Sequence, residues 1–291
     1  MYVGSDSMEY NLREDIKMVM ELLDLQINDI AGIMGVEPIT INRLLKNNII
    51  IAKENMERLY SYVYRKKIHL NLIKSTLYEE DGEDYSKVLY HGAKDKITEP
   101  ISLARGRENN DFGKAFYTGE GYPQAASFVS NKSDSRVYVF NLNVHKLNGL
   151  ELGVNLEWMI MIAYFRGRLK RYENHPYILK LLDKLKGVDY IKAPIADNRM
   201  FMIIDTFIAG EITDMQCRHA LACANLGNQY VLISDKAIKE LKPIDTLYLC
   251  EDEKSYYLNK RLEDSSISND KVRMARIKYK NQGVYIDEVL K

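Results

Sequence analysis

Three short segments, far apart in the chain, each bring a polar side chain to the end of an expected strand, beside apolar or aromatic residues. They are Leu89–Gly92 with His91, Asp111–Thr118 with Tyr117, and Asn228–Leu232 with Gln229. An imidazole and an amide can hydrogen-bond a sugar hydroxyl, an aromatic ring can stack on a planar ring, and a carboxylate can stabilise a cation. Taken one at a time, ordinary strand and turn packing explains each segment better.

The order of the three segments resembles the layout of ADP-ribosyltransferases of the diphtheria-toxin and poly(ADP-ribose) polymerase type. That layout has Tyr-His-Gly, then Gly-x-x-Phe-Tyr-Thr, then a strand that usually reads Glu-Tyr-Val. Here the third strand reads Gln229-Tyr230-Val231. A polar stretch follows Tyr117, and after it come the small pair Ala125-Ala126 and the aromatic Phe128, as in those enzymes.

A closer resemblance, covering about residues 89–241, is to the bacterial family catalogued as domain of unknown function 3990, which is grouped with the same transferases. The residues that carry it are His91-Gly92, Asp111–Thr118, Gln124-Ala125, Trp158, Asp189–Ile191, Pro194–Asn198, Gly210–Ile212 and Gln229–Val231. Glutamine is frequent at the third position in that family. Two acids often follow the alanine matched by Ala196, and here the second is Asn198. Both resemblances imply an α+β domain with an ADP-ribosyltransferase-like split β-sheet and helices.

By resemblance, this domain would use NAD⁺, and the family's roles fall on matched positions. His91 would hydrogen-bond a ribose hydroxyl, and the backbone of Gly92 would hold the nicotinamide amide, because no side chain blocks its approach. Tyr117 and Phe128 would sandwich the nicotinamide ring. Gln229 would bind the 2′-hydroxyl of the nicotinamide ribose. The expected cofactor-binding set is Tyr90, His91, Gly92, Arg105, Tyr117, Thr118, Phe128 and Gln229.

Cleavage of the bond to nicotinamide passes through an oxocarbenium-like state, so a nearby negative charge would assist it. Gln229 can orient the sugar, but a neutral amide supplies no charge and cannot act as a base. Asp111 and Asp197 are the carboxylates expected to supply the charge. The expected catalytic set is therefore His91, Tyr117, Gln229, Asp111 and Asp197. Both aspartates are explained equally well as caps, of the turn before Gly113 and of a helix at Met200.

Other candidate sites are weaker. Arg105 lies in a polar loop, where its guanidinium could meet the pyrophosphate of NAD⁺, and an ordinary solvated loop is the equal alternative. The three cysteines match no zinc or disulfide framework, and no metal site is expected. Glutamine at position 229 also argues against polymer elongation, which favours single transfer or hydrolysis of NAD⁺.

Apolar spacing predicts four N-terminal helices, over residues 12–23, 27–34, 40–45 and 53–64, followed by an acidic linker over 79–86. Strands are predicted over 88–91, 115–118, 137–142, 189–195 and 229–233. Helices are predicted within 156–185, broken near Pro176, and over 213–226 and 236–241. Residues 200–207 are apolar and fit a strand or a helix, and the helix is favoured. Two or three short pieces of uncertain order are expected after Pro243. The expected domains are 1–78, the linker, a catalytic domain over 87–243 and an extension over 244–291.

Residues 12–64 resemble the helix-turn-helix of phage-repressor-type regulators, through Ile27–Met34, Gly35-Val36 and Thr40–Leu45. This resemblance would place four side chains at the bases or phosphates of DNA, namely Thr40, Asn42, Arg43 and Lys46. The first 75 residues carry ten basic and ten acidic side chains, so the module as a whole lacks the positive charge typical of DNA-binding domains. A helical docking or dimerisation module is the alternative.

The whole chain has 41 basic and 41 acidic residues, which excludes binding of polyanions through bulk charge. No secretion signal and no apolar run of about 20 residues is visible, so a cytoplasmic protein without a membrane segment is expected. The resemblance favours a mono-ADP-ribosyltransferase that modifies a protein or nucleic acid in a toxin–antitoxin or phage-defence setting, with an antitoxin and DNA as candidate partners. The alternatives are a DNA-binding regulator that only senses NAD⁺ or ADP-ribose, and an interaction protein with an inactive transferase fold.

Overall fold

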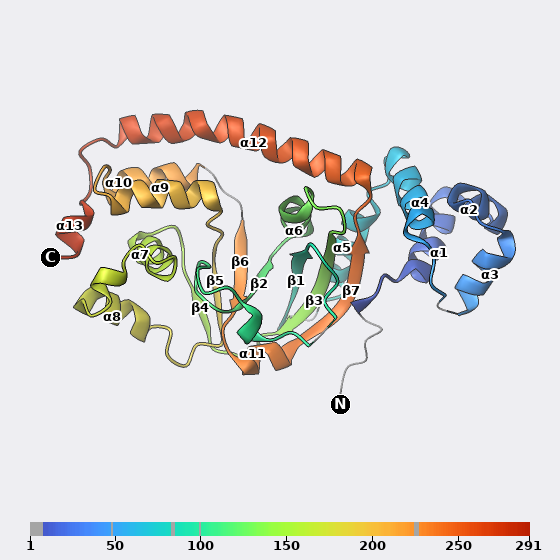
Figure 1. The fold of residues 1–291 in the computed structure, drawn as a ribbon, viewed down its shortest axis with the longest axis horizontal. Helices are drawn as coiled ribbons and strands as arrows, with labels where there is room; N and C mark the ends of the chain where they lie inside the picture. The colour runs from blue at the N-terminus through green and yellow to red at the C-terminus, as the bar shows by residue number, and fades with distance from the viewer. Residues whose placement is uncertain (1–7, 48, 83–84, 99, 224–226) are drawn as a thin grey trace.

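The structure is a computed structural model that describes residues 8–47, 49–82, 85–98, 100–223 and 227–291, with the backbone alone over 265–268. It is an elongated molecule with α-helices and one β-sheet. Figure 1 shows a group of helices at one end, the sheet near the middle and a long helix that runs along the top. The fold is therefore a mixed α+β structure with an N-terminal helical region.

The strands form one seven-stranded sheet in the order β4-β5-β6-β2-β1-β3-β7. Their bounds are β1 Ser86–Ala93, β2 Phe116–Gly119, β3 Arg136–Asn143, β4 Gly149–Glu151, β5 Tyr190–Pro194, β6 Asn228–Leu232 and β7 Leu241–Tyr248. Neighbouring strands pair in antiparallel fashion, except that β4 and β5 are parallel.

The sheet is divided between its central strands. β1 pairs with β3 along its whole length, from Ser86 to Ala93, but its register with β2 has one residue pair, Tyr90 with Gly119. β2 in turn pairs with β6 along its whole length, from Phe116 to Gly119. The sheet therefore consists of two halves, β4-β5-β6-β2 and β1-β3-β7, whose hydrogen-bonded ladder joins at one point.

The helices that follow β1 cover the sheet. Their bounds are α6 Tyr122–Val129, α7 Leu156–Phe165, α8 Pro176–Asp183, α9 Asn198–Ile208, α10 Asp214–Ala222, α11 Asp235–Glu240, α12 Glu251–Lys278 and α13 Ile286–Val289, with short 3₁₀ turns at Leu103–Arg105 and Lys170–Tyr172. α7, α9 and α10 share a core with Ile191 and Val231 of one half-sheet, and α6 shares a core with Val137 and Val139 of the other. α12 crosses above both helix groups (Figure 1).

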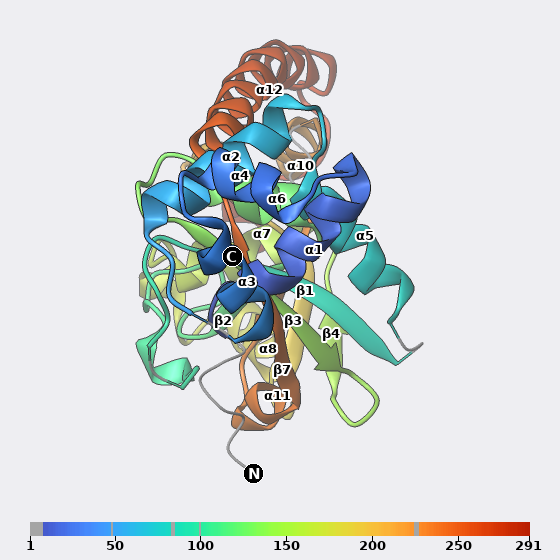
Figure 2. The same ribbon diagram turned by 90° about the vertical axis from the view of Figure 1, so that its right-hand side faces the viewer.

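Five helices form the N-terminal region, namely α1 Leu12–Leu23, α2 Ile27–Met34, α3 Pro38–Lys46, α4 Lys53–Arg65 and α5 Leu70–Glu80. Gly35 ends α2 in the left-handed region (φ 70°), where a Cβ would be strained, and its N–H bonds the last turn of the helix. Pro38 occupies the first turn of α3, where no N–H is needed. Figure 2 shows α1–α4 in front of the sheet when the molecule is seen from this end.

A buried ion cluster connects this region to the sheet. Lys74 on α5 forms ion pairs with Asp15 on α1 and, at 2.6 Å, with Asp245 on β7. The hydroxyl of Tyr60 on α4 donates to Asp15 at 2.5 Å, and that of Tyr78 donates to Asp245 at 2.6 Å. The N-terminal helices and the sheet therefore share one polar core in which every one of these charges has a partner.

The predicted N-terminal helices and the five predicted strands are confirmed, with ends shifted by one or two residues. The helix predicted over 213–226 ends at Ala222, and residues 224–226 lie outside the described residues. The linker expected over 79–86 includes the end of α5, which was not predicted, and the first residue of β1. Residues 83–84 lie outside the described part.

The expectation for the residues after Pro243 is wrong. The boundary at 243/244 falls inside β7, an edge strand of the sheet, and a helix of 28 residues follows it. This segment is integral to the fold, because α12 packs on α4, α6 and α10. None of the helices in the described ranges is both long and apolar enough to cross a bilayer.

Candidate active site

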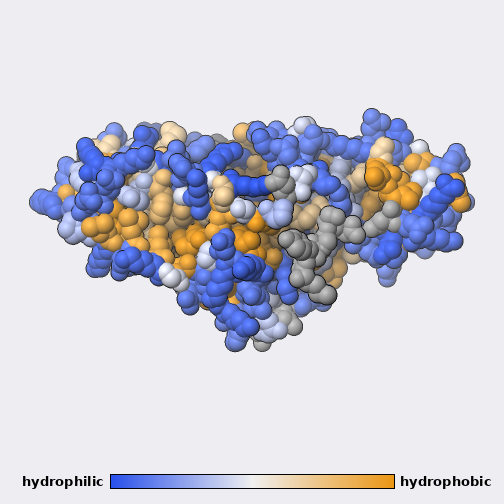
Figure 3. Space-filling view, turned by 60° about the horizontal axis from the view of Figure 1, so that its bottom comes forward, coloured by the Kyte–Doolittle hydropathy of each residue, from blue (hydrophilic) through white to orange (hydrophobic). Residues whose placement is uncertain are grey.

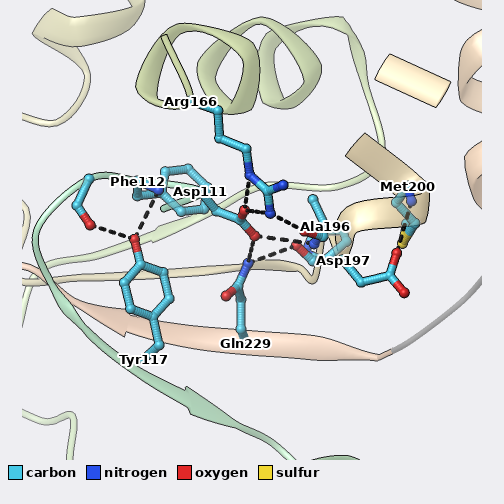
Figure 4. A network of polar contacts seen from close by, with 10 residues as sticks. Asp111, Phe112, Tyr117, Arg166, Ala196, Asp197, Met200 and Gln229 are labelled. Atoms are coloured by element: carbon cyan, nitrogen blue, oxygen red, sulfur yellow. Dashed lines mark hydrogen bonds and ion pairs between the residues drawn. The ribbon is translucent and has the colours of Figure 1, made fainter. Parts of the chain in front are cut away.

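A buried carboxylate lies where the loop before β2 meets β6. Asp111 is 6% exposed, and its Oδ1 accepts hydrogen bonds from Arg166 Nε at 2.9 Å and Nη2 at 2.5 Å. Its Oδ2 accepts from Gln229 Nε2 at 2.8 Å and from the N–H of Ala196 at 3.2 Å. These donors fix the carboxylate, and the guanidinium of Arg166 neutralises its charge (Figure 4).

Gln229 is the second residue of β6 and is 5% exposed. Besides its bond to Asp111, its Nε2 donates to the carbonyl of Pro194 at 3.2 Å. No described residue donates to its Oε1, which Figure 4 shows turned away from Asp111. The amide can therefore accept a hydrogen bond from a hydroxyl group of a ligand.

Tyr117 lies on the same face of the sheet as Gln229. Tyr117 pairs with Val231 across β2 and β6, and residues two apart on a strand, such as Val231 and Gln229, share a face. The Tyr117 hydroxyl donates to the carbonyl of Gly113 at 2.8 Å and accepts from the N–H of Phe112 at 3.0 Å. Burial raises the pKa of Tyr117 well above its ordinary value, so the ring is neutral and is held at its outer end.

His91 bridges the division of the sheet. Its Nδ1 lies 2.7 Å from the carbonyl oxygen of Tyr117, and its ring lies 4.7 Å from that of Phe116. Because a carbonyl oxygen only accepts, Nδ1 carries the proton, and Nε2 of the neutral ring is an acceptor. Burial lowers the pKa of His91, while the bond to Tyr117 raises it, and the net shift is downward. The side chain of His91 therefore joins β1 to β2, which share one residue pair in their backbone ladder.

Phe128 and Asp197 lie at a groove of about 500 Å³ between α6, the start of α9 and α12. Phe128 is 45% exposed, so its ring face is available to a ligand. Asp197 Oδ1 accepts from the N–H of Met200 at 2.8 Å, which confirms the helix-cap interpretation of this residue. The turn-cap interpretation of Asp111 is wrong, because the N–H of Gly113 bonds the carbonyl of Asn110 instead.

Tyr90 and Thr118 use their hydroxyls within the fold. Tyr90 is buried and donates to Glu79 Oε1 on α5 at 3.0 Å. Thr118 is buried and donates to the carbonyl of Tyr230 at 3.0 Å. The first bond joins β1 to α5, and the second joins β2 to β6. Neither hydroxyl points toward Gln229.

Gly92 and Arg105 have different surroundings. A Cβ on Gly92 would lie 2.5 Å from the carbonyl oxygen of Ala125, so the close packing of α6 on β1 requires glycine there. Arg105 ends a short 3₁₀ turn and is exposed. The structure therefore brings together Asp111, Tyr117 and Gln229, and places Phe128 and Asp197 at the groove. His91 meets the backbone of Tyr117 but packs its ring on Phe116, on the other face of β2 from the Tyr117 side chain.

Arg166 and Arg199 belong to this region and were not predicted. Arg166 ends α7 and also donates to the carbonyl of Ala196, and its guanidinium lies 4.5 Å from the ring centroid of Phe201. Arg199 is the second residue of α9 and lines the groove. The one sequence signal for Arg166 is its position directly after an apolar helix; its partner Asp111 is 55 residues away.

The four side chains expected to meet DNA all lie on α3. Arg43 and Lys46 are exposed in its last turn, and Thr40 is half-buried. Asn42 Nδ2 donates to the carbonyl of Pro38 at 3.1 Å. Two cationic groups are therefore available on this helix.

Residues 87–242 match the family described as protein of unknown function, DUF3990. The match covers more than half of the chain and includes Asp111, Tyr117, Arg166 and Gln229. The chain belongs to this family. The N-terminal helices and α12 lie outside the DUF3990 match. Comparisons with curated proteins and with solved structures gave no match.

Proposed function

We propose that this DUF3990 protein is an NAD⁺-dependent mono-ADP-ribosyltransferase that modifies a macromolecule, either a protein or a nucleic acid. The observation that carries the proposal is the buried contact of Gln229 with Asp111, with the ring of Tyr117 on the same face of the sheet. Gln229 Oε1 is a hydrogen-bond acceptor that suits a ribose hydroxyl, and the aromatic rings of Tyr117 and Phe128 suit the planar nicotinamide ring. His91 packs on Phe116, and its role in this proposal rests on the family resemblance alone.

The proposed reaction breaks the bond between C1′ of the ribose and the nicotinamide nitrogen. Nicotinamide leaves with the electron pair, and a nucleophile of the acceptor bonds C1′ and gives up its proton. The transition state carries positive charge on the ribose, as in glycoside hydrolysis, so the protein must orient the sugar and place negative potential near it.

Gln229 orients the sugar in this proposal, and Asp111 acts through it. The Asp111 carboxylate accepts from Gln229 Nε2, which polarises the amide and makes Oε1 a stronger acceptor for the 2′-hydroxyl. Arg166 balances the charge of Asp111, so the field at the ribose is smaller than a lone carboxylate would give. This arrangement favours single transfer or hydrolysis over polymer elongation.

The groove also fits the proposal, because consecutive residues connect it to Asp111. Ala196 donates to Asp111, and the next residue, Asp197, lines the groove with Phe128. Asp197 caps α9, so we assign the electrostatic role to Asp111 alone. The resemblance to the transferases further suggests a toxin–antitoxin or phage-defence setting with an antitoxin partner.

The test is transfer of label from NAD⁺ carrying a labelled adenylate, incubated with the protein and a cell extract. The proposal predicts label in macromolecules, which protease or nuclease digestion assigns to protein or nucleic acid. His91→Ala and Tyr117→Ala are expected to abolish the labelling, whereas Tyr117→Phe, which keeps the ring, should retain part of it. Release of nicotinamide without labelling would indicate a hydrolase, and unchanged NAD⁺ would contradict the proposal.

A second candidate function is a DNA-binding regulator that senses NAD⁺ or ADP-ribose. Arg43 and Lys46, exposed on α3, support it. Leu22, Ile39 and Ile50 are also exposed in this region, and Figure 3 shows hydrophobic residues at the N-terminal end of the molecule, which favours protein docking instead. Binding of the protein to its own promoter fragment that weakens with added salt, and is lost in Arg43→Gln/Lys46→Gln, would support the regulator.

A further inference from the structure

The groove between α6, α9 and α12 contains three cationic side chains. Arg199 comes from the first turn of α9, and Lys260 and Arg261 come from α12. Two carboxylates, Asp197 and Asp264, also line it. The three cations outnumber the two carboxylates, so the lining of the groove is net positive.

Arg199 is the least satisfied of these groups. Its Nε and Nη1 are buried, and in the described ranges neither has a hydrogen-bond partner. Buried N–H groups of a guanidinium that lack partners are costly, because their hydration is lost and nothing replaces it. The N-terminus of α9, an 11-residue helix, adds positive potential at the same place. Negative charge in the groove would offset this cost through its field.

Phe128 gives the groove an aromatic wall on the α6 side. The guanidinium of Arg261 lies 5.9 Å from the centroid of its ring, so a cation of α12 and a partly exposed ring lie side by side. A ligand that carries both a planar ring and negative charge can use both groups at once. The groove volume of about 500 Å³ lies within the range that small-molecule ligands occupy.

We infer that Arg199, Lys260 and Arg261 bind the phosphate groups of the dinucleotide, so that α12, which lies outside the family match, completes the substrate groove. The inference rests on the proposed function, because the division of the sheet, with Gln229 and Asp111, adjoins this groove through Ala196 and Asp197. The ribose and nicotinamide lie toward Gln229 and Tyr117, and the phosphates lie under α12.

The test compares a triple variant, Arg199→Gln/Lys260→Gln/Arg261→Gln, with the wild type in calorimetric titrations with ADP-ribose and with nicotinamide. The dissociation constant for ADP-ribose should rise by at least about tenfold, since hydrogen bonds to charged groups are lost. Nicotinamide carries no phosphate, so its affinity should stay the same. The matched control is Lys271→Gln/Arg273→Gln/Lys280→Gln, which removes the same charge from exposed positions away from the groove. Thermal unfolding verifies that each variant folds.

The outcomes separate this inference from the proposed function. Unchanged ADP-ribose affinity in the triple variant overturns the inference, while release of nicotinamide by the wild type still supports the enzyme. Loss of ADP-ribose affinity in a protein that never cleaves NAD⁺ supports the groove and contradicts the transferase. Binding of a single-stranded oligonucleotide that the triple variant loses, with unchanged ADP-ribose affinity, would overturn the inference and assign the cations to an acceptor.

Discussion

Asp111 carries a buried negative charge that a guanidinium, an amide and a backbone N–H hold in place. Such a charge is stable only while its partners remain, because the carboxylate has lost its water. Arg166 therefore stabilises the fold, and the carboxylate that positions Gln229 is the one proposed to polarise it. At this scale, stability and the proposed chemistry depend on the same atoms.

Replacing Arg166 by methionine keeps most of the side-chain volume and leaves Asp111 unpaired. We expect the free energy of unfolding to fall by about 3–5 kcal/mol, the usual cost of breaking a buried ion pair. Asp111→Asn in the same chain should recover most of the loss, because the unpaired charge is removed. Denaturant unfolding of the two single variants and the double variant measures this. If the losses simply add in the double variant, the two residues are not coupled as we describe.

At the scale of elements, α9 connects the network to the groove. Asp197 caps this helix and lies next to Ala196, which donates to Asp111. The start of α9 therefore places the cap, the network and Arg199 within four consecutive residues. A change that loosens this turn should disturb stability before it disturbs chemistry.

Asp197→Ala removes the cap, so we expect it to cost about 1 kcal/mol of stability. Asp197→Asn keeps a capping oxygen and should cost less. Because we assign no catalytic charge to Asp197, the asparagine variant should cleave NAD⁺ at nearly the wild-type rate. Melting curves and nicotinamide release of both variants decide the matter. A large loss of activity in Asp197→Asn, at unchanged stability, would show that Asp197 supplies the catalytic negative charge.

The elements that sequence patterns predict well are those with one apolar face. The helix predicted over 27–34 coincides with α2, which buries Ile30, Ala31 and Met34. α5 was missed because the residues it buries include Asn71, Lys74 and Ser75, which reverses the expected pattern. α12 is polar along most of its length and has no continuous apolar stripe, so its length could not be read from periodicity.

Prediction of the candidate site from the sequence had the same limit. His91, Tyr117 and Gln229 were predicted because family motifs mark them, and the short-range capping of Met200 by Asp197 follows from helix-start rules. Arg166 and the cations of α12 were missed because their roles depend on residues more than 50 positions away, which no local pattern records.

At the scale of the whole molecule, the N-terminal helices and the sheet unfold as one unit in our account. Lys74 joins α1, α5 and β7 in one buried cluster, and Glu253 at the start of α12 accepts from Asn71 on α5 and Tyr122 on α6. Buried polar contacts therefore join the N-terminal helices to β7, α6 and α12.

Glu253 makes this junction sensitive to pH. Burial raises the pKa of Glu253 from 4.5 to about 7, although hydrogen bonds from Tyr122 and Asn71 lower it. Since the folded pKa lies above the unfolded one, its stabilising contribution is complete below pH 4.5 and is lost as pH rises through about 7.

We therefore expect the free energy of unfolding of the wild type to fall by on the order of 3 kcal/mol as pH rises. Glu253→Gln cannot ionise at this position, so it should not show this fall. The measurement is the free energy of unfolding between about pH 5 and pH 8. Asp252→Asn, which changes a partly exposed neighbouring carboxylate, is the control and should follow the wild type. Parallel curves for the wild type and Glu253→Gln would show that Glu253 does not titrate in this range.

The most direct test of the central claim is the rate of nicotinamide release from NAD⁺ by three purified proteins: the wild type, Gln229→Ala and Asn228→Ala. Asn228 is the matched control, because it precedes Gln229 on β6 and its side chain bonds Glu120 instead of the network. We predict release by the wild type and by Asn228→Ala, and a fall of about 100-fold or more in Gln229→Ala. No release by the wild type, or equal rates in all three, would contradict the account.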